Sequence, residues 1–265
     1  VLTDRPRAGC IDLSAAGDAA GFTPVWADEI ALMTSGTTGT PKLVLYDGAA
    51  ITAQLLQSES IVRKCPEVKH DRLARELRML AFVPFYHIFG LMASLLWFIF
   101  FGVTFVFLER YDSRSIQYAC KVGRVTHFFA VPAVWEQTAR QLLREAERQG
   151  QKEKLLRAVR FSNGLQSVFP RLGARLARRV LFRRVREQAL GTEPMFCISG
   201  GGFLQPQAAE LMNGLGYGMH NGYGMTETGI LSVELSRRAK WRLSGGVGLP
   251  LQALSGGWRI AEDGV

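Results

Sequence analysis

Cysteine and histidine are scarce in this sequence, with four of each among 265 residues. The cysteines (Cys10, Cys65, Cys120 and Cys197) stand far apart and form neither a Cys-x-x-Cys pair nor a metal-binding spacing. A structural zinc site or a disulfide scaffold is therefore not expected. Scattered cysteines are typical of buried thiols in a reducing compartment, and the sequence does not open on a secretory signal pattern. We expect a cytoplasmic protein.

Acidic residues are the minority among the charges. There are 23 Asp and Glu against 32 Lys and Arg, which gives a formal net charge of +9. Such a balance suits nucleic acid, a membrane surface or polyanionic small molecules such as ATP and CoA. Because no zinc-finger, helix-turn-helix or RNA-binding signature accompanies the charge, nucleic acid is not an expected partner. Hydrophobic residues make up 48% of the chain, which is enough for a packed core.

Residues 88–108 contain no charge at all, and by length alone this run could cross a membrane. Gly102 divides it into a half rich in Leu, Met, Trp and Ala and a half that is β-branched and aromatic. No basic flank lies next to it. The division favours a helix followed by a buried parallel strand, with a membrane span as the alternative.

Short apolar runs alternate with amphipathic segments along the chain. Strands are predicted at residues 79–83, 125–131 and 194–199, and helices at 49–62, 113–123, 133–150 and 206–215. Asp112 or Ser113 is expected to cap the helix that follows it, and Gly150 to end the next one. This alternation predicts an α/β fold with a mostly parallel sheet.

The stretch before Pro194 is the most basic part of the sequence. Its apolar residues recur at helical spacing, which predicts one amphipathic basic helix. Two interpretations stay open: a solvated surface helix, or an interfacial helix that contacts anionic lipid. The arginines concerned are Arg171, Arg175, Arg178, Arg179, Arg183, Arg184 and Arg186.

A glycine- and hydroxyl-rich loop, residues 34–42, separates two short apolar runs that are each predicted as buried strands. Its bare backbone N–H groups, its hydroxyls and Lys42 are groups that hold phosphates. The common nucleotide loop needs Gly, four residues and then Gly-Lys-Ser/Thr, but here Thr40 replaces the second glycine and Leu43 follows the lysine. The alternative is a hairpin turn that binds nothing.

Three further motifs follow this loop: Pro84-Phe85-Tyr86-His87-Ile88-Phe89-Gly90, Ser199-Gly200-Gly201-Gly202-Phe203-Leu204 and Asn221-Gly222-Tyr223-Gly224-Met225-Thr226-Glu227-Thr228-Gly229. With the loop, they resemble in type and order the adenylate-forming (AMP-binding) enzyme superfamily. The loop matches the family pattern Ser/Thr-Ser-Gly-Thr-Thr-Gly-x-Pro-Lys-Gly except at Leu43. Val247-Gly248-Leu249-Pro250 adds a weaker fifth motif. The insertion of residues 140–191 is most similar to bacterial long-chain fatty acid-CoA ligases.

This resemblance implies a layered αβαβα arrangement of mostly parallel sheets, as in the large amino-terminal domain of the family. Residues 1–265 would be a fragment of that domain. It would comprise an irregular lead-in (1–27), a phosphate-loop hairpin (28–47), an α/β core (79–245) and the start of a β-rich part (246–265). The family's ribose-binding acid, hinge and small carboxyl-terminal domain would follow Val265. We therefore expect the fragment alone to turn over poorly.

The implied activity is ATP-dependent activation of a carboxylic acid, with a long-chain fatty acid as the expected substrate. The acid would attack ATP to give an acyl-adenylate and pyrophosphate, and the thiol of CoA would then displace AMP. Alternatives within the family are an aryl or medium-chain acid-CoA ligase and an adenylation domain that serves a carrier protein. An alternative of another class is a non-catalytic lipid- or membrane-surface-binding protein on a degenerate fold.

The resemblance also implies roles for individual residues. Lys42, Thr226, Glu227 and His87 would form the catalytic set, with Glu227 holding Mg²⁺ and His87 positioning the acid. Thr226 would donate to the α-phosphate, Tyr223 would stack on adenine, and Asn221 would bind the edge of the base. The nucleotide would contact Thr34, Ser35, Gly36, Thr37, Thr38, Gly39, Lys42, Gly200, Gly201, Gly202, Asn221, Gly222, Tyr223, Gly224 and Thr226. Phe89, Gly90, Met92 and residues near Phe203 would wall the acyl pocket.

Overall fold

A computed structural model of the chain describes residues 28–34, 42–65, 76–99 and 102–251, together with two short parallel strands, β1 (Leu2–Thr3) and β2 (Ile11–Asp12). Most of the predicted phosphate loop, residues 35–41, lies outside the described residues. So do nearly all of the lead-in expected over residues 1–27 and the end of the chain from residue 252.

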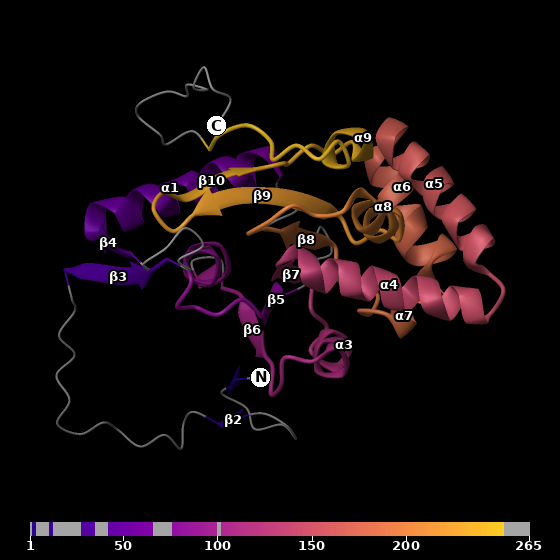
Figure 1. The fold of residues 1–265 in the computed structure, drawn as a ribbon, viewed down its shortest axis with the longest axis horizontal. Coiled ribbons are helices and arrows are strands. Elements are labelled where there is room, and N and C mark those ends of the chain that lie inside the picture. Colours follow the sequence, from indigo (N-terminus) through magenta and orange to yellow (C-terminus); the bar gives the residue numbers. More distant parts are fainter. Residues whose placement is uncertain are drawn as a thin grey trace.

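A six-stranded sheet forms the centre of the molecule, in the order β10-β9-β8-β7-β5-β6 (Figure 1). Strands β5 to β9 run parallel, and β10 returns antiparallel beside β9. The mostly parallel α/β fold predicted from the sequence is thereby confirmed. The strands are β5 (Arg78–Ala81), β6 (Thr104–Phe107), β7 (His127–Ala130), β8 (Phe196–Ser199), β9 (Met219–Met225) and β10 (Gly229–Val233).

Helices cover both faces of this sheet. Figure 1 shows α3, α4 and α8 on one side, and the two-stranded hairpin of β3 (Glu29–Met33) and β4 (Leu43–Asp47) on the other. The helical segments are α1 (Gly48–Lys64), the π-helical η2 (Phe89–Leu96), α2 (Trp97–Ile99), α3 (Ser113–Val122), α4 (Pro132–Arg148), α5 (Lys152–Val168), α6 (Pro170–Leu176), the π-helical η3 (Ala177–Leu181), α7 (Arg183–Gln188), α8 (Pro206–Gly214) and α9 (Ala239–Arg242).

The alternation of side chains along β7 divides the core in two. Phe128 and Ala130 pack into the cluster beneath α4 and α8. Phe129 packs into the cluster beneath η2 and α1, where the ring of His127 contacts Phe98. All four residues of the strand are buried, because a central parallel strand is covered on both faces.

Local signals placed several elements correctly. Asp112 accepts hydrogen bonds from the backbone N–H groups of Arg114 and Ser115, so it is the predicted cap of α3. The uncharged run divides as expected into a helical half, η2 and α2, and the strand β6. None of the described helices is long and apolar enough to cross a bilayer.

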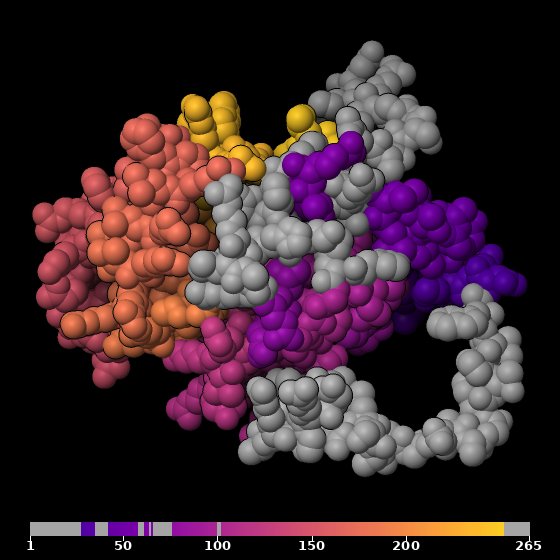
Figure 2. Space-filling model, turned by 180° about the vertical axis from the view of Figure 1, so that it is seen from behind, coloured from indigo at the N-terminus to yellow at the C-terminus, as the bar shows by residue number. Residues whose placement is uncertain are grey.

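The basic stretch is not one helix, and that prediction is wrong. The chain passes from α6 into η3 and breaks at Phe182, which is buried, before α7 starts. Arg186 does not face solvent either: its guanidinium is fully buried and donates to the carbonyls of Leu215, Thr192 and Pro194. Figure 2 shows the flank of the molecule that α5, α6 and α7 form, in rose to orange. Contact of the remaining arginines with anionic membrane stays a prediction.

The β3–β4 hairpin pairs in antiparallel register from Glu29↔Asp47 to Met33↔Leu43. The two strands were expected to be buried, but only Leu32 and Tyr46 are. Met33, Leu43 and Leu45 are exposed, because the hairpin is a two-stranded sheet with one face packed against η2 and α1. The buried Tyr46 is thereby directed towards the core.

Candidate active site

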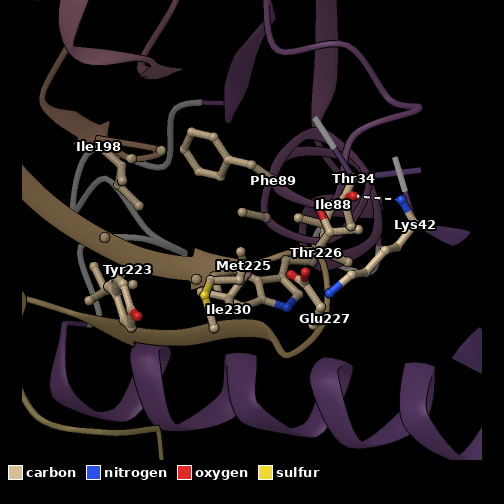
Figure 3. Close-up of a pocket in the computed structure, with 17 residues that line it drawn as sticks. Thr34, Lys42, Ile88, Phe89, Ile198, Tyr223, Met225, Thr226, Glu227 and Ile230 are labelled. Atoms are coloured by element: carbon tan, nitrogen blue, oxygen red, sulfur yellow. Dashed lines mark hydrogen bonds between the residues drawn. The ribbon is translucent and has the colours of Figure 1, made fainter. Parts of the chain in front are cut away.

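A cavity of about 460 Å³ lies where the carboxyl end of β8, strands β9 and β10, the start of η2 and the loop end of the β3–β4 hairpin meet. Its polar lining comes from segments far apart in the sequence, and its apolar wall from η2, α2, β8 and β10 (Figure 3). The lining residues are Thr34, Lys42, Ile88, Phe89, Ala93, Trp97, Ile198, Gly200, Gly201, Gly222, Tyr223, Gly224, Met225, Thr226, Glu227, Ile230 and Val233.

Thr34 and Lys42 close the ends of the predicted phosphate loop. The Thr34 backbone N–H donates to the carbonyl of Lys42 at 2.9 Å, and the Lys42 N–H donates to Thr34 Oγ1 at 3.0 Å. Beyond this pair, the Lys42 side chain is directed towards the turn that carries Thr226 and Glu227 (Figure 3). Ser35, Gly36, Thr37, Thr38 and Gly39 lie outside the described residues.

The glycine turn after β8 lets the backbone lie close to the cavity, because no side chain stands in between. Gly200 is buried, and a Cβ there would lie 3.1 Å from the ring of Phe89. Gly201 has a positive φ of 79°, a conformation that side chains other than glycine rarely adopt. Gly200 and Gly201 line the cavity, whereas Gly202 packs beside Pro132 and is not among the lining residues.

The Tyr223, Thr226 and Glu227 motif lies on a β-hairpin. Strand β9 runs to Met225, and the chain turns through Thr226 and Glu227 into β10, which the sequence did not reveal. Gly224 is needed inside this hairpin, because a Cβ would lie 2.4 Å from the carbonyl oxygen of Gly229. Tyr223, Thr226 and Glu227 all line the cavity that Lys42 enters.

Two polar residues that the sequence did not single out hold this turn. The Tyr46 hydroxyl donates to the Thr226 carbonyl at 2.6 Å. The Gln54 carboxamide donates to the Thr228 carbonyl at 3.2 Å and accepts from the Ile230 N–H at 2.9 Å. Burial raises the pKa of Tyr46, and the nearby Glu227 carboxylate raises it further. The phenol therefore stays protonated and able to donate.

Several predicted site residues are not among the lining residues. His87 is exposed, with its ring tilted against that of Tyr86, and the Asn221 side chain donates to the Gly246 carbonyl at 3.4 Å. Of the proposed acyl wall, Phe89 lines the cavity, while Gly90 and Met92 are buried outside it and Phe203 is exposed at the surface. The roles given to these residues stay predictions.

The cavity suits a magnesium ion that is shared with a phosphate ligand. Among the described lining residues Glu227 is the one carboxylate, and the part of the chain that the structure describes has no cluster of three or more potential metal ligands. Mg²⁺ typically takes one or two protein carboxylates and completes its octahedron with water and substrate phosphates. A single exposed acid facing a lysine fits that requirement better than it fits a metal cage made by protein alone.

The fold and this cavity define a class of protein. A family model described as "AMP-binding enzyme" matches residues 12–256, and the chain therefore belongs to the AMP-binding, adenylate-forming family.

Among its relatives, the chain is 29% identical over 207 residues to acyl-CoA synthetase ALT10 of Alternaria alternata, which covers 77% of this chain and 27% of that protein. It is 26% identical over 233 residues to long chain acyl-CoA synthetase 6, peroxisomal, of Arabidopsis thaliana, which covers 86% of this chain and 31% of that protein. The chain thus spans less than a third of the length of either curated relative.

Two examples illustrate the solved structures that share the fold. The inhibitor-bound N-terminal domain of FACL13 from Mycobacterium tuberculosis superposes with a TM-score of 0.55 at 18% identity, covering 96% of this chain and 51% of that one. O-succinylbenzoate coenzyme A synthetase from Bacillus subtilis, in complex with ATP and magnesium, superposes with a TM-score of 0.55 at 21% identity, covering 89% and 38%.

Proposed function

We propose that this chain provides the nucleotide- and acid-binding part of an acyl-CoA synthetase. The reaction would join a carboxylic acid to the α-phosphate of ATP with release of pyrophosphate, and then pass the acyl group to the thiol of CoA with release of AMP. The observation that carries the proposal is the shared lining of one cavity by Lys42, Tyr223, Thr226 and Glu227.

The charges in this lining suit the first step, in which a carboxylate approaches a triphosphate. Two anions repel, so the site has to neutralise charge and align the reacting atoms. Lys42 supplies a cation from the hairpin end, and the Thr226 hydroxyl supplies a donor from the turn. Glu227 would hold Mg²⁺, which when bound neutralises phosphate charge. Tyr223, 43% exposed, offers a ring face for a base.

The apolar side of the cavity suits the body of the acid. Phe89, Ala93 and Trp97 line it from η2 and α2, and Ile198 and Val233 from the sheet. These side chains offer no group that would pair with a second charge, which favours a fatty acid over a dicarboxylic acid. Among fatty acids we propose a long-chain substrate. Assays with acids of graded length test this. A preference for medium-chain or aryl acids would overturn the proposed long-chain substrate but not the proposed ligase activity.

Substitution of Glu227 tests the reaction itself. Glu227→Gln keeps the shape of the side chain but removes the charge that would hold the metal. We expect acid-dependent ATP–pyrophosphate exchange to fall about 100-fold, as for the loss of one electrostatic group in an active site. The matched control is Glu210→Gln on the exposed surface of α8, which should leave exchange unchanged.

Absence of exchange with every acid tried, measured in the complete synthetase of which this chain is proposed to be a part, would contradict the proposal. It would favour the non-catalytic lipid-binding alternative. If Glu227→Gln exchanged at the unsubstituted rate, Glu227 would have no role in the reaction. The ligase proposal would then rest on the other lining residues.

A further inference from the structure

The segment that follows the predicted phosphate loop also reaches the turn on the far side of the cavity. Strand β4 starts directly after Lys42, and it leads into α1 without a break. Tyr46 on β4 and Gln54 on α1 are both 5% exposed, and neither lines the cavity. A buried glutamine needs partners for its carboxamide, and Gln54 finds them in the backbone of another hairpin.

Gln54 bonds β10, which is the edge strand of the sheet beside β9. The Ile230 N–H donates to Gln54 Oε1, and the register of β9 and β10 shifts just beyond this point, between Ile230 and Ser232. Gly229, with a φ of 74°, leaves the room for this carboxamide, because a Cβ there would lie 2.3 Å from the Gln54 Cδ atom. The fit requires glycine at 229 both for its backbone and for its lack of a side chain.

Tyr46 holds the other end of the same turn. Its hydroxyl donates to the Thr226 carbonyl, while the Gln54 amide donates to the Thr228 carbonyl, so two carbonyls that flank Glu227 are fixed from one segment. Gln54 is itself fixed, because its backbone carbonyl accepts from the indole N–H of Trp97 at 3.1 Å. Trp97 is 3% exposed and lines the cavity.

We propose that Tyr46 and Gln54 form a turn clamp, which fixes the Thr226–Gly229 turn relative to Lys42 and so positions Thr226 and Glu227 towards the triphosphate and its Mg²⁺. Both are positioning residues, since they act through the backbone of the turn. The inference rests on the proposed function for the identity of the ligand. The clamp itself rests on the four hydrogen bonds described above.

Two substitutions remove the clamp while keeping its volume. Gln54→Met leaves the Thr228 carbonyl and the Ile230 N–H without their partner, and Tyr46→Phe removes only the hydroxyl. The matched control is Gln166→Met, which changes a glutamine on α5 that is equally buried and bonds Ser162 and Asn213. ATP affinity is measured by calorimetry, once with Mg²⁺ and once with EDTA, and the melting temperature of each variant is recorded.

In the unsubstituted chain, Mg²⁺ should strengthen ATP binding. We expect Gln54→Met to reduce this magnesium-dependent gain in ATP affinity about tenfold, and Tyr46→Phe to reduce it by less. Gln166→Met should lower the melting temperature by a similar amount but keep the full gain. Amide exchange should also become faster at Ile230 in Gln54→Met than at its neighbours in β10. Variants that melt earlier but keep the full magnesium gain would overturn the clamp as a positioning device.

The two proposals can fail separately. If the unsubstituted chain binds no ATP with or without Mg²⁺, the proposed function fails, and the exchange rate at Ile230 still decides the clamp. Unchanged protection of Ile230 in Gln54→Met would then show that the carboxamide does not hold the turn. Full ATP binding with an unchanged magnesium gain would overturn the clamp alone.

Discussion

A single buried side chain, His220, should lower the stability of the folded chain at acidic pH. It lies on β9, buried beside the ring of Phe196, and its Nδ1 is 2.7 Å from the Glu234 carbonyl oxygen. Burial and, to a smaller extent, the positive charge of Arg242 lower the pKa of His220 to about 3, although the bond to Glu234 opposes the shift. The native state therefore holds a neutral imidazole where the unfolded chain has an ordinary histidine.

A folded-state pKa below the unfolded value near 6.5 means that the unfolded chain binds the proton first. The free energy of unfolding contributed by His220 is fully present above pH 6.5 and is lost as the pH falls towards 3. The expected slope is about 1.4 kcal/mol per pH unit. Urea unfolding of the unsubstituted chain and of His220→Gln between pH 7 and 4 measures it. Curves that stay parallel over this range would contradict the assignment.

Gln54 and Tyr46 illustrate a limit of sequence reasoning at this scale. Glutamine inside an amphipathic helix and tyrosine inside a strand are ordinary residues, and nothing in their spacing indicates that they are buried against a distant turn. Thr226, Glu227 and Lys42 were recognised because they belong to motifs. Their common cavity depends on contacts between segments that are far apart in the sequence, such as that of Tyr46 with Thr226, which are 180 positions apart.

Elements with strong local signals were predicted well. Helix α3 begins where Asp112 caps it, and α4 begins at Pro132 and ends before Gly150, which has a φ of 64°. Strand β10 was missed because Gly229 and the motif before it are typical of a turn. The break at Phe182 was missed because helical spacing continues through it, while burial of Phe182 and Arg186 decides the chain direction.

Arg186 anchors α7 to the segments that lead into β8 and β9, so we expect its loss to be severe. Arg186→Leu would leave three carbonyls without a donor, two of them buried, and would remove the guanidinium that lies over the Tyr217 ring, 4.0 Å from its centroid. The free energy of unfolding should fall by about 3–5 kcal/mol. Arg183→Leu is the control: its pair with Glu187 is exposed, and its loss should cost less than about 1 kcal/mol. Equal losses in denaturant titrations would contradict this role.

For the molecule as a whole, the site brings together two hairpins that lie far apart in the sequence. The β3–β4 hairpin precedes the central sheet in sequence, and the β9–β10 hairpin follows most of it, yet both face one cavity (Figure 3). A ligand that contacts both hairpins should therefore stabilise the entire fold instead of a local segment.

Thermal unfolding measures this coupling. At a MgATP concentration 100 times the Kd, binding to the native state adds about 2.7 kcal/mol. For a chain of this size the melting temperature should rise by roughly 5–10 °C. Lys42→Ala should show a smaller rise at the same concentration, because one of the two hairpins no longer contributes its charge. If the melting temperature rose equally in both proteins, Lys42 would not contribute to binding of the nucleotide.

Trp97 gives the cavity an optical reporter of its own. Its indole lines the cavity and its N–H is held by the Gln54 carbonyl, so the ring cannot turn away when a ligand enters. Of the other tryptophans that the structure describes, Trp135 is buried in the opposite core and Trp241 lies at the surface. Among the tryptophans that the structure describes, Trp97 is thus the one whose emission should change when an acid enters the cavity, without any added label.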